Sequence, residues 1–129
     1  MSYTLLRKIA FEKRKKLENY IFSIHSELDV TGYCAIASYS LWKSIPDSIF
    51  VHFENNLLME HCFIEVKNYI IDITPDQFWG KHRKVLVERK NKYLERLPSK
   101  GTFIYNEEAL DFINEYWPDE QKPNEDIPI

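Results

Sequence analysis

Cys34, His61 and Asp72 are the residues of this chain whose types and order could carry out covalent chemistry. A thiolate can attack a carbonyl carbon, an imidazole can move the protons, and a carboxylate can orient the imidazole. Cys34 follows Gly32 closely and opens an apolar run to Trp42, which predicts a buried helix with the thiol in its first turn. The positive end of that helix dipole would lower the pKa of the thiol and favour the reactive thiolate.

The elements that must position His61 and Asp72 are two runs rich in β-branched and aromatic residues, 61–66 and 69–74. The runs flank Lys67-Asn68, which predicts a β-hairpin with a two-residue turn in which the asparagine takes a positive φ. The chemistry therefore depends on which residues this hairpin brings face to face.

The register of such a hairpin places Phe63 opposite Asp72 and His61 opposite Thr74. Side chains alternate between the faces of a strand, so all four side chains share one face. His61 and Asp72 become diagonal neighbours on adjacent strands, within side-chain reach. A turn one residue longer or shorter would place the two groups on opposite faces.

The motifs around these residues resemble the core of the transglutaminase-like branch of the papain-like cysteine enzyme superfamily. The resemblance covers roughly residues 30–80 and extends to small bacterial papain-like proteins, with Phe63 at the place of their usual Trp. In those proteins a Cys-x-x-Ala-Ser helix precedes a His-x-Trp-Val-Glu block and an Asp-x-Thr-x-x-Gln-Phe block. The matching segments of this chain are Cys34-Ala35-Ile36-Ala37-Ser38, His61-Cys62-Phe63-Ile64-Glu65-Val66 and Asp72-Ile73-Thr74-Pro75-Asp76-Gln77-Phe78.

By this resemblance Cys34 is the nucleophile, His61 the base and Asp72 the group that orients the base. The backbone N–H of Cys34, at a helix start, can donate to the oxyanion. The close polar residues that could supply a second donor are Thr31 and Tyr33. Residues that could line the substrate pocket are Phe63, Thr74, Gln77, Phe78 and Trp79.

The resemblance implies a cysteine-dependent hydrolase or acyl-transfer enzyme of the peptidase, amidase or protein-glutamine deamidase type. Its substrate would be a protein or peptide, and it would need no cofactor. The alternative is a non-catalytic papain-like protein that binds a partner, such as an immunity or adaptor protein, because a fold does not fix a reaction. On that view Cys34 is a small buried hydrophobe and His61 a strand histidine bonded to backbone.

A metal site is not expected. Adjacent His61 and Cys62 point to opposite faces of a strand, and the chain has no Cys-x-x-Cys or His-x-x-x-His pair. Cys62 is therefore assigned to the core. With no signal-like start and no long apolar run, a cytoplasmic protein with two free thiols is expected, or an effector secreted without a signal peptide.

Composition bounds the fold. With 129 residues, of which 44% are hydrophobic, the chain suits one domain, expected over residues 1–117, with a flexible acidic tail over 118–129. A net charge of −3 argues against a nucleic-acid binder, although residues 7–16 are strongly basic. That basic run is assigned to the solvated side of a helix. No membrane partner is expected, and the sequence leaves the oligomeric state open.

The expected architecture is α+β, with N-terminal helices packed on a small antiparallel sheet in a papain-like or transglutaminase-like core. A long helix over 4–26 packs on the hairpin, and Thr31 is a candidate N-cap for the helix that begins near Cys34 and ends before Pro46. The remaining expected elements are strands over 49–53 and 84–87 and a helix over 107–117.

Overall fold

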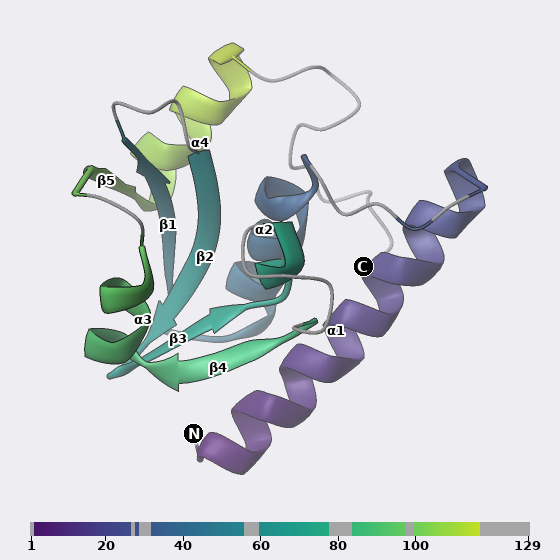
Figure 1. Ribbon diagram of the computed structural model, residues 1–129, viewed down its shortest axis with the longest axis horizontal. Coiled ribbons are helices and arrows are strands. Elements are labelled where there is room, and N and C mark those ends of the chain that lie inside the picture. Colours follow the sequence, from purple (N-terminus) through teal and green to yellow (C-terminus); the bar gives the residue numbers. More distant parts are fainter. Residues whose placement is uncertain are drawn as a thin grey trace.

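The residues that the structure describes form an α+β fold of four α-helices and a five-stranded antiparallel sheet (Figure 1). This computed structural model describes residues 2–26, 28, 32–55, 60–77, 84–97 and 100–116, without the side chains of 77, 115 and 116. The elements in chain order are α1 (Tyr3–Ile24), α2 (Cys34–Ser44), β1 (Ile49–Glu54), β2 (Glu60–Val66), β3 (Tyr69–Asp72), the 3-10 helix η1 (Pro75–Gln77), β4 (Leu86–Arg89), α3 (Lys90–Arg96), β5 (Thr102–Tyr105) and α4 (Asn106–Tyr116).

The turn and register of the predicted hairpin are confirmed in β2 and β3, since Val66 pairs with Tyr69 and Ile64 with Ile71. The hairpin is shorter than expected, because β3 ends at Asp72 and the pairing stops at Ile64–Ile71, so Phe63–Asp72 and His61–Thr74 are not ladder pairs. The positive φ of the turn lies on Lys67, at 55°, and not on Asn68 as expected. The strand order β4-β3-β2-β1-β5 places the hairpin in the middle of the sheet.

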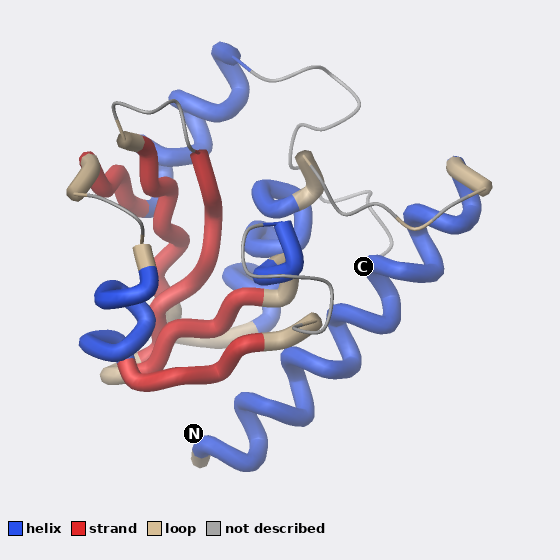
Figure 2. Tube along the Cα trace, in the orientation of Figure 1, coloured by secondary structure: helices blue, strands red, loops and turns tan. Residues whose placement is uncertain are grey.

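Helices cover both faces of the sheet (Figure 2). On one face α1 and α2 pack on apolar side chains such as Ile64, Ile71 and Val87. On the same face α2 and α4 enclose a second cluster around Phe50 and Cys62. The other face has a smaller cluster in which Tyr93 of α3 packs among Val51, Phe53, Phe63 and Ile70. By alternation, His61 and Asp72 belong to this α3 face.

The long N-terminal helix runs as predicted to within two residues at each end. Ser2 caps α1, because its hydroxyl accepts a hydrogen bond from the backbone N–H of Leu5 at 3.2 Å. The helix buries one side chain per turn, namely Leu6, Ala10, Arg14, Leu17 and Ile21. It contacts α2, β3 and β4, so it reaches the hairpin through β3.

Several element predictions need correction. The N-cap position of α2 is Tyr33, whose side chain makes no capping hydrogen bond, and the expected cap Thr31 lies outside the described residues. The fourth strand covers Leu86–Arg89, two residues later than expected, and α3 and β5 were not predicted. The strand over 49–53 and the helix over 107–117 are confirmed within one residue at each end as β1 and α4. The tail over 118–129 lies outside the described residues.

Candidate active site

The candidate site lies where β2 extends beyond its pairing with β3. β2 pairs with β1 along Glu60–Glu65 but with β3 only along Ile64–Val66. In an antiparallel ladder alternate residues turn their backbone N–H and C=O toward a given neighbour. Val66 closes the turn and turns these groups toward β3, so Ile64 and Cys62 do the same. Among the described strands none pairs with Cys62 on that side. The first turn of α2 packs against this stretch of β2.

Cys34 is the first residue of α2, and its side chain is buried. A hydrogen bond from the Cys62 side chain lowers the pKa of the Cys34 thiol most strongly. Burial raises this pKa, while a hydrogen bond and charge from His61 and a bond from the Cys62 backbone lower it again. The net effect lowers the pKa of Cys34 to about 5, so the group is a thiolate at neutral pH.

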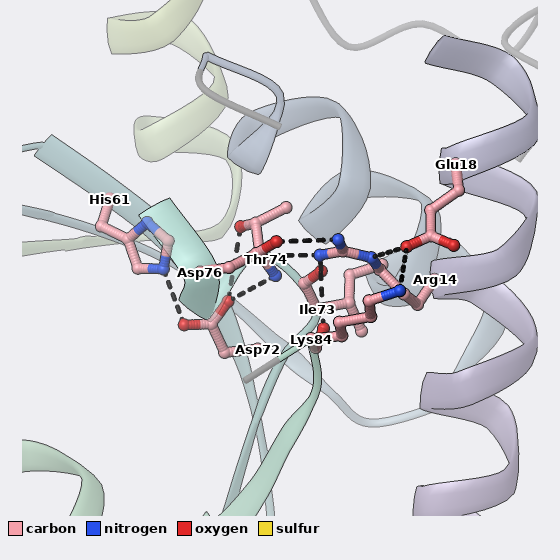
Figure 3. Close-up of polar contacts among 8 residues, drawn as sticks. All are labelled: Arg14, Glu18, His61, Asp72, Ile73, Thr74, Asp76 and Lys84. Atoms are coloured by element: carbon pink, nitrogen blue, oxygen red, sulfur yellow. Dashed lines mark hydrogen bonds and ion pairs between the residues drawn. The ribbon is translucent and has the colours of Figure 1, made fainter. Parts of the chain in front are cut away.

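His61 is the positive partner of this thiolate. Its Nε2 lies 2.7 Å from Oδ2 of Asp72, and both side chains are fully buried (Figure 3). Burial lowers the pKa of His61, but the charges and hydrogen bonds of Asp72 and Cys34 outweigh it and raise this pKa to about 10. The ring is therefore an imidazolium between two anionic groups.

Asp72 is held by donors from three elements. Its Oδ1 accepts from the backbone N–H of Thr74 at 2.9 Å and from the Thr74 hydroxyl at 3.4 Å. Its Oδ2 accepts from His61 and from the Tyr93 hydroxyl, the latter at 2.8 Å. A buried carboxylate needs such partners to remain charged, and these bonds fix its orientation.

Tyr93 and Cys62 are the site residues that sequence reasoning missed in these roles. Tyr93 lies on the seven-residue helix α3, is fully buried and packs on Phe63 with ring centroids 4.8 Å apart. Burial and the adjacent Asp72 charge raise the pKa of its hydroxyl well above the ordinary range, so it remains a donor. Cys62 was expected to lie in the core, and it is buried. It is also a free thiol whose hydrogen bond to the Cys34 sulfur lowers the pKa of Cys34.

The other predicted site residues have varied surroundings. Phe63 is buried between His61 and Tyr93 rather than on a pocket surface, and Thr74 holds Asp72. The Tyr33 hydroxyl lies 3.0 Å from Nε2 of His25, which links the end of α1 to the start of α2. The candidates that lie outside the described residues are Thr31, Phe78, Trp79 and the side chain of Gln77.

A buried arginine fixes the segment that follows Asp72. Arg14 of α1 donates to the carbonyl of Ile73 at 2.9 Å and to both carboxylate oxygens of Asp76 at 2.7 and 2.8 Å (Figure 3). Its Nε donates to Glu18 at 2.9 Å. The sequence pattern assigned this basic run to a solvated helix side, but Arg14 is only 3% exposed.

His52 is a buried polar residue with an unusual environment. Neither ring nitrogen has a hydrogen-bond partner among the described residues, and the ring packs on Phe112 with centroids 4.9 Å apart. Burial, aided by the charge of His61, lowers the pKa of His52 to about 4. The ring is therefore neutral and stands beside Cys62, its cross-strand neighbour.

No group of three or more His, Cys, Asp or Glu side chains in the described ranges could hold a metal ion. Within the same ranges no helix is both long and apolar enough to span a bilayer. Comparisons of the chain with protein-family models, with curated proteins and with solved structures gave no match. The case for a function therefore rests on the geometry of the site.

Proposed function

We propose that this protein is a cysteine-dependent acyl-transfer enzyme of the hydrolase type, with Cys34 as nucleophile, His61 as acid and base, and Asp72 as the orienting group. The observation that carries the proposal is the buried pair of His61 and Asp72, with Nε2 of His61 2.7 Å from Asp72, beside a buried Cys34 whose charge raises the pKa of His61 while His61 lowers that of Cys34. A papain-like core is part of the same proposal. A helix that starts at the nucleophile and packs on an antiparallel hairpin bearing His61 and Asp72 supports it.

In the acylation step the Cys34 thiolate attacks the carbonyl carbon of an amide or ester and forms a tetrahedral oxyanion. The backbone N–H of Cys34 is among the first N–H groups of α2, which have no partner within the helix, and it donates to the oxyanion. Because Asp72 occupies Nε2 of His61, Nδ1 is the nitrogen that delivers the proton to the leaving amine. The C–N bond of an amide breaks, or the C–O bond of an ester whose oxygen leaves as the alcohol, and a thioester of Cys34 remains.

In the deacylation step His61 is neutral and removes a proton from the incoming nucleophile. Attack of water releases a carboxylic acid, whereas attack of an amine gives a new amide. In both cases the thiolate leaves and the imidazolium is restored. The protein or peptide amide expected from the sequence fits this chemistry, and the same residues serve peptidase, amidase and deamidase reactions.

One described hollow on the α3 face could hold an apolar part of the substrate. A groove of about 490 Å³ is lined by Phe53, Leu94, Leu97, Lys100, Gly101 and Phe103. Phe53 is the cross-strand partner of His61, so the groove begins one strand away from the base. Its lining, which is apolar apart from Lys100, favours a substrate with a hydrophobic side chain.

A second candidate function is a non-catalytic binding protein, and the burial of the site favours it. Cys34 is 1% exposed and His61 is 0% exposed, so a carbonyl reaches the thiolate only after neighbouring groups move. On this view the buried charges would specify the packing of α2 on the hairpin. The two functions differ in whether Cys34 forms a covalent intermediate.

The test is acylation of the folded protein with p-nitrophenyl acetate, followed by mass spectrometry of the intact protein and its peptides. The enzyme proposal predicts an acetyl thioester on Cys34 that turns over and that is lost in Cys34→Ala. Turnover of this thioester is expected to fall at least about a hundredfold in His61→Ala, because His61 is the general base of deacylation and general base catalysis contributes at least that much.

Cys62→Ser is the matched control, since it removes the second thiol but keeps a hydrogen-bond donor beside Cys34. This variant should keep the thioester on Cys34. Acetylation confined to lysines, or equal acetylation of the wild type and Cys34→Ala, would contradict the enzyme proposal and favour the binding protein.

A further inference from the structure

β4 is the edge strand on the side of the sheet opposite β5, and among the described strands it pairs only with β3 (Figure 1). A groove of about 450 Å³ follows this strand. It is lined by each residue from Val85 to Arg89, together with Tyr3 and Arg7 of α1, Tyr69 of β3, and Lys92 and Arg96 of α3. Since consecutive residues of a strand point to opposite faces, a groove that touches all of them runs along the edge of the strand.

The backbone along this edge carries hydrogen-bonding groups that point away from β3. The N–H of Lys90 donates to the carbonyl of Asn68 at 2.7 Å. This bond fixes which alternate residues of β4 turn their backbone groups toward β3. Glu88 and Leu86 therefore turn their backbone groups toward β3, and Val87 and Arg89 turn theirs away. Arg89 is the N-cap of α3, so its carbonyl accepts the first hydrogen bond of that helix. The backbone groups that point outward are therefore the N–H and C=O of Val87 and the N–H of Arg89.

Aromatic rings hold the cations of the groove in place. The Arg7 guanidinium lies 5.8 Å from the Tyr3 ring centroid, Tyr3 lies 5.5 Å from Tyr69, and Arg89 lies 5.6 Å from Tyr69. These contacts form one continuous row from α1 to the end of β4. The row keeps two positive charges on the same side of the β4 edge, where Arg89 is exposed and the Val87 side chain is buried in the core.

The groove has an excess of positive charge although the whole chain has a net charge of −3. Its one acid, Glu88, is paired with Arg96 at 2.7 and 3.0 Å. Arg7, Arg89 and Lys92 have no carboxylate partner within the described ranges. A partner that brings carboxylates to this edge would neutralise three charges that the protein leaves unpaired.

We propose that the β4 groove binds an extended acidic peptide segment of a partner protein, which adds to the sheet as a strand beside β4. The alternation of donors and acceptors on Val87 and Arg89 matches a polypeptide backbone, whereas a phosphate chain offers only acceptors. The like charges of the edge oppose pairing between two copies of β4. The site is separate from Cys34 and does not depend on the proposed enzyme activity.

The test is the fluorescence anisotropy of a labelled peptide of about eight residues that alternates glutamate and valine, titrated with the full chain. The control peptide has the same sequence with N-methyl groups on alternate amides, so it keeps the charge but cannot pair with a strand. A single-stranded oligonucleotide of similar charge is the second control. We expect the unmodified peptide to bind at least about tenfold more tightly than either control, since strand pairing adds main-chain hydrogen bonds.

Lys92→Glu and Lys15→Glu are matched variants, because each reverses one exposed helix lysine and only Lys92 lines the groove. We expect Lys92→Glu to weaken binding of the acidic peptide about fivefold and Lys15→Glu to leave it unchanged within about twofold. Circular dichroism verifies the fold of both. The proposal is overturned if the wild type does not bind the acidic peptide, if either control binds equally well, or if the two variants lose affinity equally.

Discussion

Asp72 is the residue on which the candidate site converges. Its two carboxylate oxygens accept from the His61 ring, from Thr74 and from the Tyr93 hydroxyl, and none of these groups is exposed to solvent. A carboxylate without such partners would be too costly to bury in its charged form. The charge of Asp72 in turn keeps His61 protonated, and through His61 it favours the thiolate of Cys34.

Tyr93→Phe tests the dependence of Asp72 on its donors. The change removes the hydroxyl that donates to Asp72 at 2.8 Å but keeps the ring that packs on Phe63. We expect the free energy of unfolding to fall by about 1.5 to 3 kcal/mol, since the lost bond is to a buried charge. Urea denaturation measures this, and Tyr105→Phe, which alters an exposed tyrosine, should change it by less than about 0.5 kcal/mol.

An unchanged urea midpoint in Tyr93→Phe would show that Asp72 does not depend on this donor. The same variant separates stability from chemistry, because it leaves His61 and its bond to Asp72 in place. The thioester on Cys34 should therefore still form in the fraction that is folded. Loss of the thioester from fully folded Tyr93→Phe would mean that Tyr93 contributes to the reaction itself and not only to the stability of Asp72.

The juxtaposition of His61 and Asp72 could be predicted from the sequence because it depends only on turn length and strand alternation. The contacts of Tyr93 and Cys62 could not. Tyr93 reaches Asp72 from a helix that is adjacent in space but 21 residues away in the chain. Cys62 lies on the opposite face of β2 from His61, and it meets Cys34 because α2 packs on that face.

At the scale of elements, α1 acts as a brace for the loop that carries the site. Arg14 joins the middle of this helix to the carbonyl of Ile73, which follows Asp72, and to Asp76 in η1. The sequence showed a basic run and predicted a solvated surface. One member of that run is buried, because its spacing from Ala10 and Leu17 puts it on the packed side of the helix.

Arg14→Met tests the brace. The substitution keeps an unbranched side chain of similar length but leaves Asp76 and the Ile73 carbonyl without their donor. We expect a loss of about 3 kcal/mol in the free energy of unfolding, as for other buried ion pairs that lose one member. Thermal denaturation measures the change, with Lys15→Met on the exposed side of α1 as control.

Equal melting temperatures for Arg14→Met and Lys15→Met would contradict a bracing role. If Arg14→Met is destabilised but its folded fraction retains the thioester on Cys34, the brace holds the fold without tuning the site. The melting temperature and the thioester on Cys34 can both be measured in these two variants.

The elements that sequence analysis missed share a weak signal. α3 is seven residues long and buries one side chain, Tyr93, which is too little for a helical periodicity to emerge. β5 is a four-residue border strand without a buried side chain. The longer elements α1, α2 and α4 and the strands β1 to β3 were predictable because each has a sustained apolar pattern.

At the scale of the whole molecule, the charges at the site exist because the fold holds opposite charges together, although burial by itself disfavours each of them. Cys34 and His61 are fully enclosed, and their opposite charges stabilise one another where water does not screen them. Unfolding separates the two groups and returns each pKa to its ordinary value. The ion pair is therefore confined to a window from about pH 5, below which Cys34 is protonated, to about pH 10, above which His61 is neutral.

The measurement that tests the central claim most directly is the rate of Cys34 alkylation by iodoacetamide in the folded protein as a function of pH. Peptide mass spectrometry assigns the label to Cys34 in wild type and in His61→Ala, so Cys62 need not be changed. Only the thiolate reacts, so the rate should rise with pH through the pKa of Cys34 and then level off.

We predict a half-maximal rate near pH 5 in the wild type and a shift toward the ordinary thiol pKa of 9.0 in His61→Ala. A half-maximal rate near pH 9.0 in both proteins, or labelling of Cys34 only after unfolding, would contradict a thiolate–imidazolium pair that can react in the folded protein.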